Sequence, residues 1–403
     1  MRPELEAVAT PEMLLLCSIA RLEMDEASEA RLDRALGRGI DWDRLGPLAE
    51  FHGLRPLLYR HLGQREDGRV PESARAAMKR DAHAIAAKNL GMARELVDLT
   101  NLLSTAGVES VPLKGPVLAE AVYGSHAMRE FGDLDIAVRP RDLDRALDAL
   151  AEVGFRSTTG LGRRADRVVH RASGAVPLRR LGSGPLVEVH WSLMPRYRPG
   201  LTLEDVWGRR GSEVLMDRPI ASLDPEDRFI ALAVHGGKHA WGSLGWLVDV
   251  AEAGRPGRLD RRAVSARAVA AQVTRSVELA SSLADDVLAA AHGIEWSDTA
   301  KDLANDLGKR LVSEVAPPYP PNSAADHRFF LGVRETMAQR AAYLSGLVLA
   351  PMPADAAAVR LPDRLAFLYR VVRPARLVTR TVARSTRRHR ARAPHGDAME
   401  RAA

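Results

Sequence analysis

The segment Asp133-Leu134-Asp135-Ile136-Ala137-Val138 alternates polar and apolar residues, a pattern that is typical of a strand with one buried face. Successive side chains of a strand point to opposite sides of the sheet, so Asp133 and Asp135 share a face. Two carboxylates roughly 7 Å apart along one face repel each other unless a positive charge lies between them. We expect that charge to be Mg²⁺, because this ion prefers oxygen ligands.

A turn with a basic residue precedes this strand. Residues 108–113 form a short apolar run that predicts another strand, and Lys114-Gly115 follows as the turn. Pro116 then suits the first position of a helix. Backbone N–H groups at the Gly115 turn and the helix N-terminus would bind phosphate, and Lys114 would supply a point charge.

A third acidic residue follows the strand. Val187-Glu188-Val189-His190 alternates in the same way, so Glu188 and His190 share one face of a later strand. Three carboxylates can hold two metal ions. One ion would lower the pKa of an attacking hydroxyl, and the other would neutralise a leaving pyrophosphate.

These features lie in a central unit, residues 106–195, for which we expect the order β-α-β-α-β-β. Its last two strands, 176–181 and 186–191, are joined by Gly-Ser-Gly-Pro, which predicts a hairpin. Residues 1–105 and 196–383 show apolar residues at helical spacing. Beyond the central unit, the clearest helices are predicted at 225–253, 262–292 and 298–313. A further helix is predicted at 327–349, after a proline-rich linker at 316–321. We therefore predict an α+β protein that is mostly α, with a small mixed β-sheet flanked by N-terminal and C-terminal helical regions.

The charge of the chain is concentrated at its end. The 403 residues carry 58 basic and 52 acidic side chains, for a net charge of +6. Residues 370–403 contain ten arginines and two acids, so the rest of the chain has a net charge of −2. Balanced charge over the body is not typical of a protein built to bind nucleic acid. Residues 384–403 predict a disordered Arg-rich tail, which could make weak contact with RNA or anionic lipid.

The composition of the chain further limits the class of protein to which it can belong. No apolar run approaches the ~18 residues needed to span a bilayer, and the first residues lack the pattern of a signal peptide. The single cysteine, Cys17, excludes an internal disulfide and a cysteine-rich zinc site. We expect a cytoplasmic protein with Cys17 in its core.

The ordered set of motifs resembles the nucleotidyltransferase superfamily with a DNA-polymerase-β-like palm. More narrowly, it is similar to the uncharacterised nucleotidyltransferase family of bacterial proteins over roughly residues 80–380. The similarity rests on short stretches in a fixed order: Pro112-Leu113-Lys114-Gly115, Asp133 to Val138, Val187-Glu188-Val189-His190-Trp191, His235 to Trp241, Leu244 to Asp249, and Leu361-Pro362. Two departures from the superfamily are the turn Lys114-Gly115-Pro116 in place of Gly-Gly or Gly-Ser, and a longer gap from Gly115 to Asp133.

The resemblance implies transfer of a nucleoside monophosphate from an NTP, with ATP expected, to a hydroxyl or phosphate of an acceptor. The acceptor would be a small molecule, a peptide or a protein. Asp133, Asp135 and Glu188 would be the catalytic residues and would bind Mg²⁺ or Mn²⁺, and Glu188 would help to deprotonate the acceptor. Lys114 and Gly115 would hold phosphates.

Four other residues are candidates for the same site. Arg129 either contacts phosphate or forms a salt bridge that relieves repulsion near Asp133. His190 is either a partner of the metal ligands or a packed strand residue. Lys238 and His239 share a helix face with His235, and they either face the nucleotide or acceptor or form a polar face packed near Trp241 and Trp246. His235 and His239 have the spacing of a metal pair, but zinc is not predicted because Gly236 stands in the place of the Glu of an H-E-x-x-H motif.

Two alternatives to this enzyme stay open at the level of sequence. One is a catalytically silent palm that serves as a nucleotide-binding or scaffold module. The other is a nucleic-acid-directed transferase that uses the basic tail, although the body has only 5% aromatic residues for base stacking.

Overall fold

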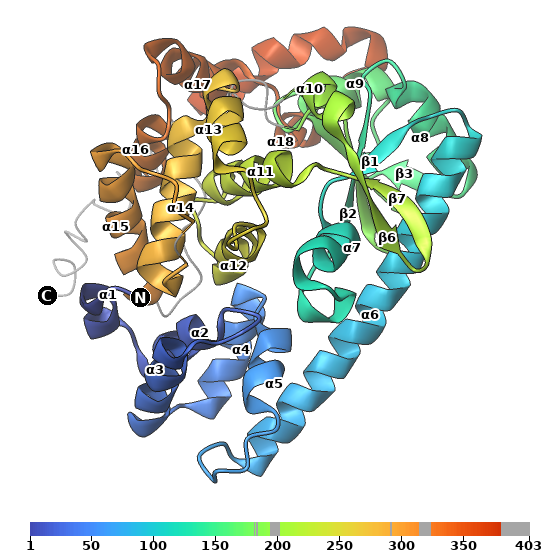
Figure 1. Cartoon of the computed structure of the whole chain (residues 1–403). Helices are drawn as coiled ribbons and strands as arrows, with labels where there is room; N and C mark the ends of the chain where they lie inside the picture. The colour runs from blue at the N-terminus through green and yellow to red at the C-terminus, as the bar shows by residue number, and fades with distance from the viewer. Residues whose placement is uncertain (181, 183, 194–201, 291, 314–323, 380–403) are drawn as a thin grey trace, which may run out of the picture.

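The computed structural model describes residues 1–180, 182, 184–193, 202–290, 292–313 and 324–379 (Figure 1). Helices surround one small mixed sheet, which confirms the predicted α+β class with mostly helical content. Within those ranges, no helix combines the length and the apolar character required to cross a bilayer. The predicted linker at 316–321 and tail at 384–403 lie outside the described residues.

The sheet has five strands in the order β1-β2-β5-β4-β3, with bounds β1 Ser110–Pro112, β2 Asp133–Val138, β3 Phe155–Ser157, β4 Ala175–Arg180 and β5 Leu186–His190. Strands β2 and β5 run parallel, and the other neighbours are antiparallel. The predicted β4–β5 hairpin is confirmed. In the β2–β5 register Asp135 lies opposite Glu188. Adjacent strands are about 4.8 Å apart, so this register brings the predicted acids together.

Short helices connect the strands of the central unit: α7 (Gly115–Leu118), a π-helical turn (Ala119–Tyr123), a 3-10 turn (His126–Met128), α8 (Leu143–Glu152) and α9 (Arg163–Val169). The predicted order β-α-β-α-β-β is wrong in one respect, because β3 and α9 stand between α8 and β4. Strand β3 has three residues and α9 has seven. Neither is long enough to show a clear hydrophobic period.

Two helical regions flank the sheet. The N-terminal region comprises α1 (Pro3–Val8), α2 (Pro11–Ile19), α3 (Glu26–Gly37), α4 (Trp42–His52), α5 (Arg55–Leu62) and the long α6 (Glu72–Thr105). The C-terminal region comprises α10 (Leu203–Arg209), α11 (Pro225–Lys238), α12 (Leu244–Ala253), α13 (Arg261–Ala270), α14 (Thr274–Leu288), α15 (Asp298–Ser313), α16 (Ala324–Gly332), α17 (Met337–Leu349), α18 (Pro353–Ala358) and a 3-10 turn at Asp363–Leu368.

A hairpin interrupts the C-terminal region, which the sequence predicted to be helical. Strands β6 (Gly211–Leu215) and β7 (Arg218–Ser222) pair in antiparallel fashion. Their turn residues, Met216 and Asp217, both have positive φ, at 52° and 59°. Such tight turns usually carry Asn-Gly or Asp-Gly, so the Met-Asp pair gave no hairpin signal.

Three of the four helices predicted beyond the central unit are each divided in two, and only 298–313 is continuous. The predicted 225–253 helix breaks after Lys238, where Ala240 and Trp241 have positive φ. The 262–292 helix breaks at Gln272, which also has positive φ. Left-handed conformations are uncommon outside glycine, and tertiary packing overrides the helical pattern here.

The N-terminal and C-terminal regions share one apolar core. Leu15 of α2 is fully buried in the same cluster as Leu283 of α14. Helix α6 contributes to two cores, since Met78 belongs to this cluster whereas Leu99 packs with Ile136 of β2. The division of the chain at 105/106 and 195/196 stays a prediction.

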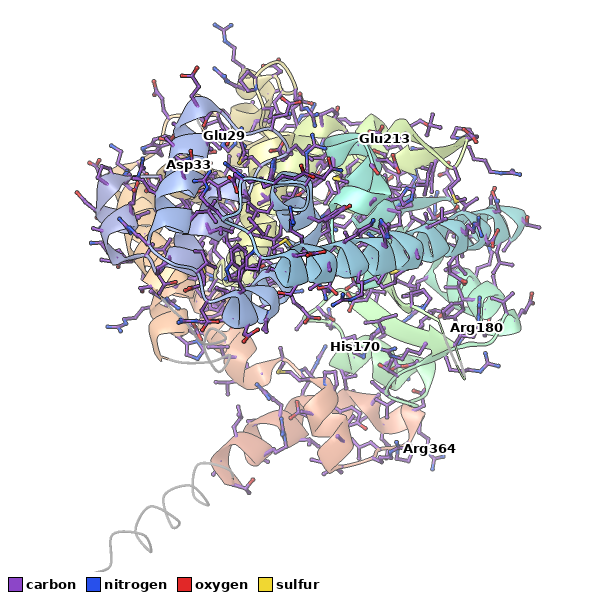
Figure 2. All side chains as sticks on the ribbon, turned by 90° about the horizontal axis from the view of Figure 1, so that it is seen from below. Glu29, Asp33, His170, Arg180, Glu213 and Arg364 are labelled. Atoms are coloured by element: carbon purple, nitrogen blue, oxygen red, sulfur yellow. The ribbon has the colours of Figure 1, made fainter. Side chains whose placement is uncertain are left out.

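Helix α6 also carries an ion pair to the sheet. Figure 2 shows it crossing the molecule from the helices near Glu29 and Asp33 to the strand that carries Arg180. Arg180 of β4 pairs with Glu95 of α6, with 2.6 Å between nitrogen and oxygen. The long helix therefore connects the sheet to the N-terminal helices.

Cys17 provides a direct test of the core. It is 1% exposed, and burial raises the pKa of its thiol to about 12. Because the thiolate is the reactive form, we expect no reaction of the native protein with a thiol-specific chromogenic disulfide reagent. One thiol per chain should react after denaturation in urea. Reaction of the native protein within minutes would contradict this packing.

His52 makes stability depend on pH. Its Nδ1 accepts the backbone N–H of Leu244 at 3.2 Å, and burial lowers its pKa from 6.5 to about 4. Between these values the unfolded chain binds a proton that the folded chain does not, so the free energy of unfolding falls as the pH falls from about 6.5 towards 4. Urea unfolding at pH 7 and pH 5 measures this effect. The His52→Gln variant should have a lower free energy of unfolding than the wild type at pH 7, and that free energy should fall less than the wild type's between pH 7 and pH 5. The exposed His83→Gln serves as the control and should keep the pH dependence of the wild type; equal dependence in both variants would refute the assignment.

Candidate active site

Asp135 is the most buried acid of the predicted site, at 3% exposure. Its Oδ2 lies 3.0 Å from Nζ of Lys114, and its Oδ1 lies 2.8 Å from Nε2 of His190. Burial acts to raise the pKa of Asp135, but the charge of Lys114 and the hydrogen bond from His190 outweigh it and hold this pKa well below its usual range. Asp135 is therefore an anion between two basic groups.

Lys114 reaches Asp135 because of the turn between β1 and α7. Leu113 donates its backbone N–H to the carbonyl oxygen of Asp135 at 3.0 Å, which fixes the turn against β2. Gly115 has φ +62°, and a Cβ there would lie 3.4 Å from the carbonyl oxygen of Asp133. The glycine thus serves the left-handed turn and its close approach to the strand. Its predicted phosphate contact stays a prediction.

Asp133 lies at the start of β2 and lines the same cavity as Asp135. It is half-buried, and no hydrogen bond to its carboxylate is formed by the residues that the structure describes. Burial, and then the negative charge of Asp135, raise its pKa. Asp133 is the predicted acid with the least compensated charge.

Glu188 and His190 project from β5 beside Asp135. Nε2 of His190 lies 2.8 Å from Oδ1 of Asp135 and 3.4 Å from Oε2 of Glu188. The hydrogen bond from His190 is the main reason that the pKa of Glu188 is lowered. Burial opposes protonation of His190, but its hydrogen bonds to the two carboxylates outweigh burial and raise its pKa. His190 therefore contacts both acids directly, and it is not merely a packed strand residue.

These side chains line one cavity of about 200 Å³. Helix α11 forms its opposite wall, and Nδ1 of His235 lies 3.5 Å from Nζ of Lys114. The cavity contains Lys114, Asp133, Asp135, Glu188, His190, Lys238 and His239 from the predicted set, together with Ser173, Arg228 and His235. Of the predicted site residues, Gly115 and Arg129 do not line it.

Helix α11 ends at Lys238, so His239 is the C-terminal cap of this helix and not one of its interior residues. Its ring still lies beside that of His235, with 4.8 Å between centroids, and stacks on Trp246 at 4.6 Å and an interplanar angle of 27°. The positive charge of Lys238 contributes to the lowered pKa of Glu188. The prediction that this face lies over the acids agrees with the geometry, and contact with nucleotide or acceptor stays a prediction.

Arg129 binds an acid of the C-terminal region. Its Nε and one terminal nitrogen donate to the two carboxylate oxygens of Asp249 at 2.7 and 2.8 Å. Tyr123 donates its hydroxyl to the same carboxylate at 2.7 Å. Of the two interpretations of Arg129, the salt bridge is the one for which the structure provides a partner. The positive charge of Arg129 also acts to lower the pKa of Asp133.

Residues far apart in sequence support the loop that enters β2. Asn89 of α6 is fully buried, and its side-chain amide donates to the carbonyl oxygens of His126 and Arg129 at 2.6 and 2.8 Å. Glu130 accepts from Arg55 of α5 at 2.6 Å. No sequence signal identified these residues, because their partners lie more than thirty residues away.

Arg228 is another residue of the cavity that was not predicted from the sequence. It is 7% exposed, and it donates to Glu213 and to Ser222, both at 2.7 Å. Those two partners lie on the β6–β7 hairpin. The hairpin was not predicted, and so the buried position of Arg228 at the cavity could not be predicted either.

The Arg129–Asp249 pair makes a quantitative prediction about stability. Asp249→Asn leaves Arg129 buried without a counter-charge, which should lower the free energy of unfolding by about 3 kcal/mol. The matched control is Glu6→Gln, which breaks the exposed pair with Arg34 and should cost less than about 1 kcal/mol. Urea unfolding measures both. Equal losses in the two variants would show that the buried pair does not fix the loop.

The sequence was also compared with known proteins. Residues 38–289 match a family described as uncharacterised nucleotidyltransferase. This match covers more than half of the chain, and it includes the five-stranded sheet and every residue of the cavity. No curated protein and no solved structure matches. The acids of β2 and β5 and the extent of the match lead to one conclusion: the chain belongs to the uncharacterised nucleotidyltransferase family.

Proposed function

We propose that the protein is a metal-dependent nucleotidyltransferase that moves a nucleoside monophosphate from an NTP, with ATP expected, to a hydroxyl or phosphate oxygen of an acceptor. The observation that supports this most strongly is the β2–β5 register, which brings Asp133, Asp135 and Glu188 into one cavity with Lys114. The acceptor is a small molecule, a peptide or a protein side chain.

The donor atoms fit a divalent cation. One ligand atom from each of Asp135, Glu188 and His190 lies within 4.8 Å of the others. Oδ2 of Asp135 is buried and accepts no hydrogen bond of regular geometry from the described residues, although Lys114 is close. This set differs from the predicted ligands in that His190 joins it and Asp133 stands outside it. Carboxylate oxygens suit Mg²⁺, and an added imidazole suits Mn²⁺ equally.

When bound, such an ion would neutralise charge on the phosphates and lower the pKa of an attacking hydroxyl. Lys114 pairs with Asp135 in the structure, and a cation bound to Asp135 would free its ammonium for the phosphates. Lys238 lies on the facing wall of the cavity. The two lysines are thus placed to hold the triphosphate from opposite sides.

The transfer balances as a displacement at phosphorus. The acceptor oxygen forms a bond to the α-phosphorus, the bond from that phosphorus to the bridging oxygen breaks, and pyrophosphate leaves. The acceptor proton passes to a carboxylate oxygen of Glu188 or Asp133, the two half-buried acids of the cavity. Without the cation, Nε2 of His190 holds Asp135 and Glu188 together, and in the loaded site that nitrogen would give up its proton and serve as a ligand.

The size of the cavity limits what it holds. Its volume of about 200 Å³ is below the ~300–1,000 Å³ of typical small-molecule sites. We infer that it takes the phosphates and the cation, and that the nucleoside extends from its mouth.

The enzyme is tested by following pyrophosphate release from each NTP with Mg²⁺ or Mn²⁺ and a cell extract as the source of acceptor. Asp135→Asn should lower release at least about 100-fold, since roughly 2.7 kcal/mol of transition-state stabilisation is lost. The control is Asp98→Asn, which changes an exposed acid of α6. No release by the wild type, or equal release by Asp135→Asn, would leave the silent binding module as the better account. Loss of release on ribonuclease treatment would favour a nucleic-acid acceptor.

A further inference from the structure

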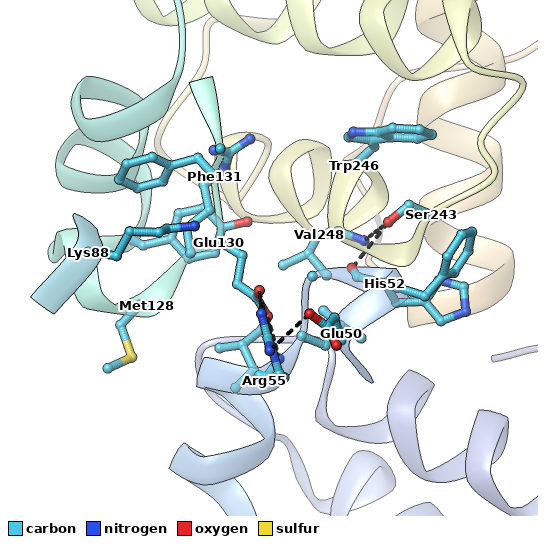
Figure 3. A pocket seen from close by; sticks show the side chains of 18 residues that line it. Glu50, His52, Arg55, Lys88, Met128, Glu130, Phe131, Ser243, Trp246 and Val248 are labelled. Atoms are coloured by element: carbon cyan, nitrogen blue, oxygen red, sulfur yellow. Dashed lines mark hydrogen bonds and ion pairs between the residues drawn. The ribbon is translucent and has the colours of Figure 1, made fainter. Parts of the chain in front are cut away.

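A second cavity, of about 470 Å³, opens where the N-terminal region, the central unit and the C-terminal region meet (Figure 3). Its walls are residues 50–57 at the α4–α5 turn, Lys88 of α6, the loop 128–132 before β2, and residues 243–248 at the start of α12. This volume lies within the range of small-molecule sites. We call this cavity the junction pocket.

The junction pocket and the active-site cavity share a wall. Trp246 lines the junction pocket, and its ring stacks on His239, which lines the active-site cavity. Phe131 and Gly132 also line the junction pocket, and the next residue along the chain is Asp133. The stacked rings of Trp246 and His239 therefore lie between the two cavities, and the segment that leads directly into Asp133 forms part of the wall of the junction pocket.

Of the Arg and Lys residues that line the junction pocket, all but Lys88 are paired with carboxylates, and Arg55 is shared by two of them, Glu130 and the exposed Glu50. Arg129 is neutralised by Asp249, and Arg55 by Glu130 at 2.6 Å. Lys88 is exposed, and no carboxylate of the described residues lies within ion-pair distance of it. Figure 3 shows Lys88 and Phe131 on one side of the pocket and Trp246 with Ser243 on the other. Phe131 is mostly buried in the core of the sheet, so an apolar body would lie against the partly buried Trp246, and an anionic group would meet the ammonium of Lys88.

Contacts between regions hold the walls in place. Ser243 donates its hydroxyl to the carbonyl oxygen of His52 at 3.1 Å. A Cβ on Gly245 would lie 2.7 Å from that same carbonyl oxygen, so α12 approaches the α4–α5 turn closely. Arg55 also donates its backbone N–H to Glu130 at 3.1 Å. The pocket is preformed, and ligand binding does not have to order it.

We propose that the junction pocket binds the acceptor of the transfer, a small molecule with an apolar, ring-bearing body and an anionic carboxylate or phosphate group. The identification of this ligand as the acceptor rests on the proposed function, whereas the binding of such a ligand in the junction pocket does not. The other occupant to consider is the nucleoside of the NTP, and the experiment distinguishes the two.

The experiment is photo-crosslinking of the full chain with two anionic benzophenones, 4-benzoylbenzoate and 4-benzoylphenyl phosphate. Neutral 4-methylbenzophenone is the third arm. Peptide mapping by mass spectrometry locates the adducts. We expect adducts at the walls of the junction pocket, in residues 50–57, 128–132 or 243–248, and at least fivefold less adduct there with the neutral probe. The more efficient of the two anions identifies the acidic group.

Lys88→Gln should reduce the adducts of the anionic probes at least fivefold, whereas Lys79→Gln, which changes another exposed lysine of α6, should leave them unchanged. Addition of ATP with Mg²⁺ should not displace the probes. The proposal would be overturned by adducts scattered elsewhere or by equal labelling of Lys88→Gln and the wild type. Displacement of the probes by ATP would also overturn it, because the pocket would then belong to the nucleotide. Because no turnover is measured, failure here leaves the proposed function standing, and absence of turnover leaves this binding site standing.

Discussion

The buried carboxylate of Asp135, held between Lys114 and His190, is the interaction on which the site depends. An ionised carboxylate at 3% exposure is costly unless it is paired and hydrogen-bonded. Both basic partners come from other elements: Lys114 from the turn after β1, and His190 from β5. The charge of Asp135 therefore requires the turn after β1, strand β2 and its parallel neighbour β5 to be in register. The same requirement places Glu188 and Asp133 at the cavity.

The surroundings of this acid are built from the whole chain. The loop before β2 is bound by Asn89 from α6, by Arg55 from α5 and by Asp249 from α12. The N-terminal and C-terminal helices also share one apolar core. The helical regions therefore fix the position at which β2 begins, and they enclose the junction pocket beside the acids. This arrangement explains why a small sheet is accompanied by so many helices.

Much of the fold could be predicted from local patterns. The period-two alternation around Asp133 and Glu188 predicted two strands whose acids share a face, and both strands are present. The β6–β7 hairpin could not be predicted, because Met216 and Asp217 adopt positive φ through tertiary packing and not through a turn signature. The helix breaks near Trp241 and Gln272 have the same cause.

The site was predictable to the extent that it lies on these strands. Asp133, Asp135, Glu188 and His190 share a face because side chains alternate along β2 and β5. Helix spacing predicted that Lys238 and His239 share a face with His235, but their position at the cavity depends on how α11 packs against the sheet. The partner of Arg129 was not predictable. Asp249 lies 120 residues away, and nothing in either local sequence distinguishes a salt bridge from a phosphate contact. Arg228 was missed because its partners lie on the unpredicted hairpin.

The central claim is that the acids around Asp135 hold a divalent cation. Electron paramagnetic resonance of Mn²⁺ added to the protein measures this without substrate, and spin-echo modulation detects a coordinated imidazole nitrogen. The account predicts bound Mn²⁺ that is lost in Asp135→Asn and retained in Asp98→Asn, with a nitrogen signal from His190 that disappears in His190→Gln. Free Mn²⁺ in the presence of the folded wild type, or binding unchanged by Asp135→Asn, would contradict it.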